Sequence, residues 1–350
     1  MPIDIIAMRS SRFANLRVLP TMECKIVKKG YCCLKEAKLT DWRNIKNGYE
    51  IPSENYCDQP YVVVLPDGSR LCVMTTSPGL EGEQGQHIVS YRTLDRGLTW
   101  EKKVDVEESG EQESSYAVLL KTGYGRVYCF YNFNEDNLRG VRAGSPPYVD
   151  GICKRVDTLG KFMFRYTDDG GRTWSPERYE APVREIELDR QNPYGGAVRF
   201  FWNVGRAFEH KGSGYVPLHK VGAFADGFMC NSRGVLLKSS NIMTENDPQK
   251  ICWETLPDGE YGIGPVKGGS FVADEHNFIV LSDGSLYCVY RSTDGHPICC
   301  YSRDDGHSFS EPQYKLYANG RVFHHPRAAN FVWKCKNGKY LYWFHNHYGA

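Results

Sequence analysis

Short apolar runs joined by glycine-containing turns recur along the chain. Residues 61–77 (YVVVLPDGSRLCVMTTS) comprise an apolar run, an Asp-Gly turn and a second apolar run, and 277–293 (NFIVLSDGSLYCVYRST) repeat this arrangement. Two strand-like runs joined by Asp-Gly are typical of a β-hairpin. Weaker copies lie at 117–133 and 330–347. This pattern predicts an all-β fold made of repeated hairpins, and we expect no substantial helix.

A second repeat follows three of these units after one further apolar run. It reads TLDRGLTW at 93–100, TDDGGRTW at 167–174 and SRDDGHSF at 302–309, and a degraded copy begins at Ser239 with its tryptophan delayed to Trp253. The aspartate can accept hydrogen bonds from neighbouring backbone N–H groups, and glycine permits a positive φ. The closing aromatic residue can pack the turn against a sheet. We therefore interpret this box as a structural turn and not as a catalytic motif.

The regular order of hairpin, third strand and box predicts small four-stranded sheets stacked radially, which is a β-propeller. Residues 1–50 form a separate N-terminal segment, a candidate for closing the last blade, and the propeller domain spans 51–350. The blades are expected at about 55–105, 115–180, 195–258, 270–315 and, in part, 322–350.

Charge and hydrophobicity argue against nucleic acid and membranes as partners. The formal net charge is +1, from 43 basic and 42 acidic residues, so no basic surface for nucleic acid is indicated. No run of 18 apolar residues exists, so no membrane partner is expected. The start lacks the apolar stretch of a signal peptide. We therefore expect a cytoplasmic protein, or a secreted or periplasmic one if a leader was removed.

The cysteines do not indicate a metal site. There are 13, scattered and without matched C-x-x-C pairs. Five of them lie in apolar strand-like runs and are expected to be buried, reduced thiols: Cys72, Cys129, Cys288, Cys299 and Cys300. No cofactor motif is present in the sequence, so we expect neither a metal nor a cofactor.

The repeated box resembles the Asp-box, or BNR, signature of the sialidase superfamily. This resemblance implies a six-bladed propeller with its site at the central axis, on the face opposite the boxes. The chain is short for six blades and stops inside a strand-like run, so its C-terminal part is expected to be missing. Family sialidases carry three arginines that bind the sugar carboxylate, an aspartic acid proton donor, and a tyrosine nucleophile paired with a glutamate.

The best match to these residues is DEHNFIVLSDGSLYCVYR, in which Glu275 precedes the hairpin and Arg291 ends it. The first arginine of the family should stand at the head of the first blade, where this chain has Asp58 followed by Gln59. A carboxylate about 4 Å from a substrate carboxylate repels it by roughly 4 kcal/mol at an effective dielectric near 20. Sialic acid is therefore not the expected substrate.

Other candidates occupy comparable places. The acid is expected in the loop 77–87, which offers Glu81, Glu83 and His87. The third arginine and the tyrosine are expected beyond residue 350, with Tyr348 as the nearest alternative. Further binding candidates at blade heads are Arg327, His325, Arg206 and Trp202.

Two function classes follow, both with a glycan or oligosaccharide as partner. The first is a sialidase-like, exo-acting glycoside hydrolase that removes a terminal sugar by carboxylate acid/base chemistry. Its catalytic candidates are Glu275, Asp58, Glu83 and Glu81. The second is a non-catalytic glycan-binding propeller, because one fold hosts many functions. A lyase on the same propeller is a lesser possibility. The sugar, the linkage and the stereochemical outcome stay open.

Overall fold

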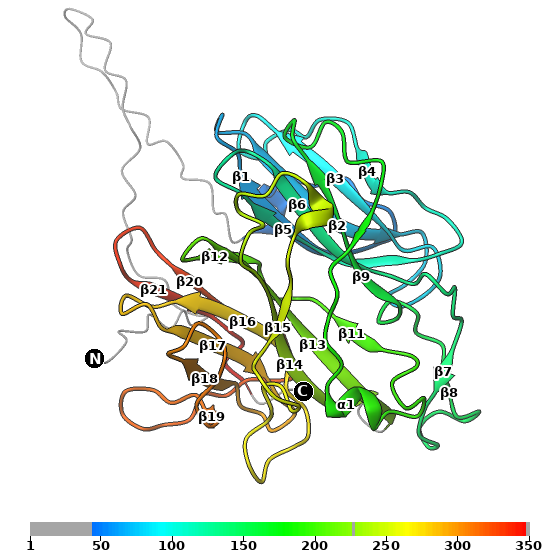
Figure 1. Ribbon diagram of the computed structural model, residues 1–350, viewed down its shortest axis with the longest axis vertical. Coiled ribbons are helices and arrows are strands. Elements are labelled where there is room, and N and C mark those ends of the chain that lie inside the picture. Colours follow the sequence, from blue (N-terminus) through cyan, green and yellow to red (C-terminus); the bar gives the residue numbers. More distant parts are fainter. Residues whose placement is uncertain (1–43, 226–227, 348–350) are drawn as a thin grey trace, which may run out of the picture.

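The computed structural model describes residues 44–225 and 228–347 (Figure 1). The predicted closing segment therefore lies largely outside the described residues. The described chain is almost entirely strands and turns, with one four-residue helix, α1 (Glu187–Arg190), and two short 3-10 turns at Ile45–Asn47 and Pro248–Lys250. The expectation of an all-β fold is confirmed.

Four sheets of four or five strands follow one another along the chain. The first, in the order β1-β2-β3-β4, comprises β1 (Tyr56–Val64), β2 (Arg70–Ser77), β3 (His87–Thr93) and β4 (Val104–Glu107). The second, β5-β6-β9-β10, comprises β5 (Ser114–Lys121), β6 (Val127–Phe133), β9 (Lys161–Thr167) and β10 (Tyr179–Glu180). All their neighbouring strands are antiparallel.

The next two sheets repeat this plan. The third comprises β11 (Phe200–Trp202), β12 (Phe208–His210), β13 (Ser213–Ala225), β14 (Phe228–Ser239) and β15 (Glu254–Leu256). The fourth comprises β16 (Asp274–Val280), β17 (Leu286–Arg291), β18 (Ile298–Ser302) and β19 (Gln313–Tyr314). Two strands, β20 (Phe331–Lys334) and β21 (Tyr340–Trp343), form a fifth, two-stranded sheet.

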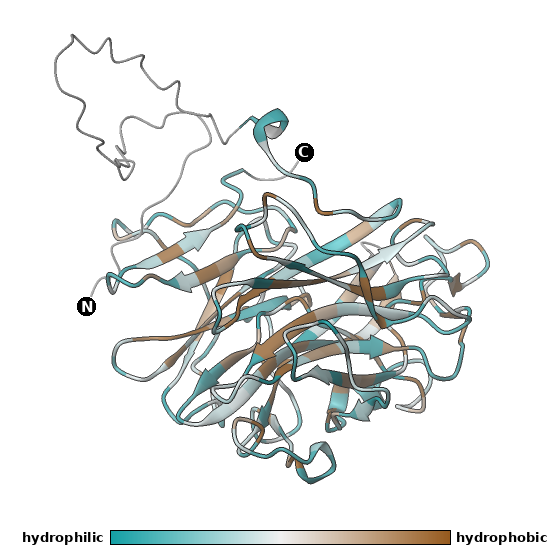
Figure 2. Ribbon diagram, turned by 90° about the horizontal axis from the view of Figure 1, so that it is seen from above, coloured by the Kyte–Doolittle hydropathy of each residue, from teal (hydrophilic) through white to brown (hydrophobic). Residues whose placement is uncertain are grey.

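These sheets are the blades of a propeller, and Figure 1 shows them following one another round the molecule from β1 to β21. Contacts join β1 with β5, β13 with β16, and β16 with β20. Buried apolar side chains form clusters that span neighbouring blades. One cluster contains Leu71 and Leu119, and another contains Ile279 and Val332. Figure 2 shows the hydrophobic residues concentrated along the strands.

The prediction of six blades needs correction. The described residues form four multi-stranded blades and the hairpin β20–β21. Six was the number implied by the family resemblance, whereas each complete blade needs four strands and the described residues supply enough for only four.

The two Asp-Gly hairpins of the sequence analysis are confirmed as β1–β2 and β16–β17. The box turns also form as expected. The Asp169 carboxylate accepts the Thr173 N–H at 3.0 Å and the Thr167 hydroxyl at 2.8 Å. Equivalent bonds form at Asp95 and Asp304. The aspartate therefore satisfies the turn's own donors, which is a structural role.

The boxes and Glu275 lie at opposite ends of the strands. In the fourth blade, Asp274 pairs with Arg291 at one end of the hairpin, whereas Leu286 pairs with Ser302, the first residue of a box, at the other. The expected separation of the two features is confirmed.

Replacing Asp169 by Ala should lower the free energy of unfolding by about 1–2 kcal/mol, because the side chain caps turn donors that have no other partner of equal geometry. Thermal melting measures the loss. Asp169→Asn, which keeps one acceptor oxygen, is the matched control and should lose less. An unchanged melting temperature in the Ala variant would contradict the structural role.

Two long connections between strands contain secondary structure of their own. The stretch 134–158 contains the short hairpin β7 (Val141–Arg142) and β8 (Ile152–Cys153), and 184–200 contains α1. In the second insertion, buried Asp189 pairs with buried Lys220 of β13 at 2.5 Å. The second insertion is therefore fixed to its blade.

The five cysteines expected to be buried thiols are buried and free. Among the described residues, no helix is long and apolar enough to cross a membrane.

Candidate functional site

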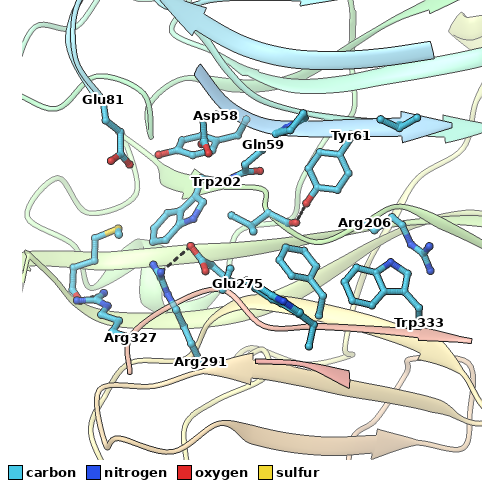
Figure 3. Close-up of a pocket in the computed structure, with 18 of the residues that line it drawn as sticks. Asp58, Gln59, Tyr61, Glu81, Trp202, Arg206, Glu275, Arg291, Arg327 and Trp333 are labelled. Carbon is cyan, nitrogen blue, oxygen red and sulfur yellow. Dashed lines mark hydrogen bonds and ion pairs between the residues drawn. The ribbon is translucent and has the colours of Figure 1, made fainter. Parts of the chain in front are cut away.

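A cavity of about 830 Å³ opens where the inner strands of the blades converge (Figure 3). Its walls come from β1, the start of β5, β11 and the residues after it, β14, the start of β16, the end of β17, and β20–β21. Side chains from every blade thus meet in one place, as expected for the axial site of a propeller.

Three lining residues have a left-handed backbone: Gln59 at φ 52°, Tyr116 at φ 59° and Glu275 at φ 59°. Each lies where the inner strand of its blade slips in register against the next strand. Successive side chains of a regular strand point to opposite faces, and a β-bulge re-aims them. This is how both Asp58 and Gln59 line the cavity. Strained backbone of this kind clusters at functional sites.

The strain gives a prediction for Gln59. Gln59→Gly should be more stable than Gln59→Ala by about 1 kcal/mol, because a Cβ is unfavourable at positive φ. Denaturant melts of both variants measure the difference. The same pair at Cys57, on the same strand and outside the positive-φ region, should show the opposite order, because Gly weakens an ordinary strand. If Ala is the more stable at both positions, the bulge is not strained.

Glu275 belongs to a buried network of opposite charges. Its carboxylate lies 3.0 Å from the Arg291 guanidinium. Asp274 is fully buried and lies 3.2 Å from both Arg291 and Arg327. Burial raises the pKa of Glu275 to about 7, although the ion pair with Arg291 opposes this. Glu275 can therefore exchange a proton near neutral pH.

The backbone of Glu275 is held by a histidine. Its N–H donates to Nδ1 of His219 at 3.2 Å. Burial lowers the pKa of His219 well below its usual value, so the ring is neutral and can accept this bond. The same ring lies edge-on to Trp202, with ring centroids 3.4 Å apart. The bulge, the histidine and the tryptophan thus position one another.

A second group of acids lies across the cavity from Glu275. Burial, followed by repulsion from Glu81, raises the pKa of Asp58 to about 6, against a hydrogen bond from Tyr56 that lowers it. Glu81 itself forms an ion pair with Arg155. Asp58 also contributes to the raised pKa of Glu275. The two carboxyl groups therefore influence each other's protonation across the cavity.

Arg155 is held in place by Asp157 and Tyr116. Its Nε lies 2.7 Å from buried Asp157, and it donates to the Tyr116 hydroxyl at 2.6 Å. The Tyr116 hydroxyl in turn donates to Asp157 at 2.7 Å. The insertion 134–158 thus delivers a cation that is neutralised by carboxylates on two sides.

An aromatic wall covers the opposite part of the cavity. Phe331 and Trp333 stack with centroids 5.6 Å apart, and Trp343 lies beside Phe331 at 6.2 Å. Trp343 is 46% exposed. Aromatic faces in a largely apolar cavity that also holds a few charged groups are suited to the apolar face of a sugar ring.

Eight of the eleven site residues predicted from the sequence line this cavity. They are Asp58, Gln59, Glu81, Trp202, Arg206, Glu275, Arg291 and Arg327. Three of the four carboxylates expected at the site therefore line one cavity: Glu275, Asp58 and Glu81. Their chemical roles remain predictions.

The other three lie elsewhere. Glu83 turns back on its own loop, where its carboxylate accepts the Leu80 N–H at 2.8 Å. His87 is buried in β3, with Nδ1 3.0 Å from a backbone carbonyl oxygen two residues earlier. His325 is buried beneath the fifth sheet, with Nε2 2.7 Å from the Ala328 carbonyl oxygen. These three do not line the cavity, because local turns satisfy their polar atoms. Tyr348 lies outside the described residues.

Several lining residues were missed by the sequence analysis. Tyr116 and Arg155 come from a strand start and an insertion that carry no motif. Trp333 and Trp343 do have a signal, because they alternate with the buried Val332 and Tyr342 along β20 and β21 and so share the other face. Among residues 44–225 and 228–347, no three His, Cys, Asp or Glu side chains gather as metal ligands would.

No protein-family model and no curated protein matches this chain. Solved structures do. A Hadza microbial sialidase, Hz136, superposes with a TM-score of 0.55 at 16% identity, over 83% of this chain and 53% of that one. A Dyadobacter fermentans protein of unknown function gives 0.58 at 16% identity, over 83% and 76%.

The NanB sialidase of Streptococcus pneumoniae gives 0.52 at 10% identity, over 84% of this chain and 66% of that one. The chain thus spans about half the length of Hz136. At such identities the likeness concerns the fold. This chain has the all-β propeller fold of the sialidases.

Proposed function

We propose that this protein is a sialidase-like, exo-acting glycoside hydrolase that removes a terminal sugar from a glycan. One observation carries the proposal: Asp58 and Glu275 line one cavity from facing blades, and burial raises the pKa of both to about 6 and about 7. A pair of carboxyl groups with tuned pKa values is what glycoside hydrolysis requires.

The two carboxyl groups take different roles. Arg291 lies against Glu275 and favours its ionised form, which suits a general base or a group that activates a nucleophile. Asp58 forms no ion pair with any residue that the structure describes, and repulsion from the acid Glu81 raises its pKa. This suits a proton donor to the leaving-group oxygen. Glu81, engaged by Arg155, is the less suitable acid.

The substrate end that enters this part of the cavity is a neutral sugar. Asp58 stands where the resemblance expects a carboxylate-binding arginine. The arginines close by are already engaged, Arg291 by two carboxylates and Arg155 by Asp157 and Glu81. A sugar carboxylate would have to compete with these fixed partners and would meet Asp58 as well.

The alternative is a non-catalytic glycan-binding propeller. Two of the three carboxylates that line the cavity, Glu81 and Glu275, form ion pairs with arginines. In a binding protein these ion pairs would only maintain the shape of the pocket, so they also favour this alternative. The aromatic wall serves either function.

The test is a panel of 4-methylumbelliferyl glycosides of neutral sugars together with the matching sialoside. We expect release of the fluorophore from at least one neutral glycoside and little or none from the sialoside. Rapid release from the sialoside alone would contradict the neutral-sugar proposal. Binding without turnover of any glycan, measured by calorimetry, would support the alternative.

A further inference from the structure

The charges in the cavity are distributed unevenly. Four arginines line it: Arg155, Arg206, Arg291 and Arg327. Three of them contact carboxylates, which are Asp157 and Glu81 for Arg155, Asp274 and Glu275 for Arg291, and Asp274 for Arg327. The end of the cavity that holds the acids therefore has no surplus of positive charge.

Arg206 differs from these three. It is exposed, and it forms no hydrogen bond or ion pair with any described residue. The nearest acid along the chain, Glu209, instead accepts the Gly212 N–H at 2.9 Å. A guanidinium that lines a cavity without a carboxylate partner has its full donor capacity available to a ligand.

Arg206 lies at the end of the cavity away from the acids. Along β1 the lining runs from Asp58 to Val62, about 10–13 Å further on, and Val62 and Arg206 together also line a smaller neighbouring cavity. Along the segment that leads into β20, and in β20 itself, the lining runs from Arg327 to Trp333. Figure 3 shows Arg206 and Trp333 together, on the other side of Tyr61 from Asp58 and Glu81.

The cavity is long enough for more than the sugar that is cleaved. Clefts of roughly 300–1,000 Å³ hold drug-sized ligands, and this one, at about 830 Å³, is near the upper end. A terminal sugar at Asp58 and Glu275 leaves the region of Arg206 and the aromatic wall for the next part of the glycan.

We infer that Arg206 and Trp333 form a second sugar subsite, which takes a sugar bearing an anionic group, a carboxylate or a sulfate ester. Trp333 packs against the face of the ring and Arg206 donates to the anion as a fork. The substrate is then a glycan with a neutral terminal sugar followed by an acidic one. This inference rests on the proposed function and deepens it.

The experiment uses Glu275→Gln protein, so that binding is measured without turnover. A glycan array carries, for each neutral terminal sugar, a neutral, a uronate-bearing and a sulfated second sugar, and it also carries terminal sialosides. The best anionic glycan and its neutral counterpart are then titrated by calorimetry against Arg206→Gln, Arg206→Lys and Arg303→Gln. The last removes an exposed arginine from a box turn, at the opposite strand ends.

We expect anionic glycans to bind more tightly than their neutral counterparts. Arg206→Gln should weaken only the anionic ones, by about ten- to a hundredfold, and Arg206→Lys should keep part of the affinity. Arg303→Gln should change neither. The uronate and sulfate arms tell which anion the subsite prefers.

Equal affinity for neutral and anionic glycans would overturn the second subsite while leaving the proposed function intact. So would an equal loss of both in Arg206→Gln, since the arginine would then only shape the cavity. Preference for a terminal sialoside that is insensitive to Arg206 would place the anion at the other arginines and overturn it too. If no glycan of any kind binds or is cleaved, both proposals fail.

Discussion

Glu275→Gln should lower kcat on the true substrate by about 10²–10⁴ while leaving folding and most of the binding intact. Gln keeps the shape of the side chain but cannot accept a proton, and general-base help is worth on the order of 10²–10⁴ in rate. The side chain is held at one position by the bulge, by His219 behind its N–H and by Arg291 at 3.0 Å, so a small displacement does not restore the function.

The measurement is steady-state kinetics on whichever glycoside responds in the panel. Glu83→Gln is the matched control, because it makes the same change of side chain outside the cavity, where Glu83 turns back on its own loop. If Glu275→Gln keeps full kcat while still binding the substrate, Glu275 only shapes the cavity.

The pH dependence of the free energy of unfolding tests Glu275 without any substrate. The folded-state pKa of Glu275 is raised to about 7 from 4.5, so ionisation costs the folded protein free energy that is absent below the unfolded pKa and complete above the folded one. Gln carries no such cost. The free energy of unfolding of Glu275→Gln minus that of wild type should therefore be larger at pH 8 than at pH 5, by on the order of 1–3 kcal/mol.

Asp58→Asn should remove the general acid and slow natural substrates by about 10²–10⁴. The loss should be much smaller for an aryl glycoside whose phenolate leaves without a proton. In wild type, activity should fall as the pH rises above about 6, because Asp58 must be protonated, and as it falls below about 7, because Glu275 must be ionised. The result is a narrow bell, since few molecules hold both forms at once.

In Asp58→Asn the decline at high pH should disappear on the aryl substrate. Kinetics from pH 4 to 9 on the two leaving groups, with Glu81→Gln measured in parallel, distinguish the two possible acids. Should Glu81→Gln show the dependence on leaving group and Asp58→Asn not, Glu81 is the acid and Asp58 serves binding.

Local rules predicted the repeating unit. The Asp-Gly turns specify the hairpins, and each box satisfies its own backbone donors through one aspartate, as Asp169 does. Such interactions span only a few residues, so they can be inferred without the fold. The number of blades could not be obtained this way, because it depends on how the sheets pack round the axis.

The residues of the candidate site were likewise predictable only where local sequence fixes their position. Glu275, Arg291 and Asp58 were found in the sequence because each has a fixed position relative to a hairpin. Glu83 and His325 were wrongly expected in the cavity, because a strand end or loop does not reveal whether a polar atom is satisfied locally. Arg155 was missed, because an insertion of the second blade carries it to Glu81, 74 residues away in the sequence.

The turns and the hairpins could be predicted from the residues alone, because they depend on interactions between neighbours in the chain. Which residues share one cavity, and which arginines pair with carboxylates, follows from the packing of distant blades against one another. Bulges with positive φ at Gln59, Tyr116 and Glu275 aim three side chains at the axis. Burial and charge from other blades then set the protonation of Glu275 and Asp58, and no local pattern encodes either.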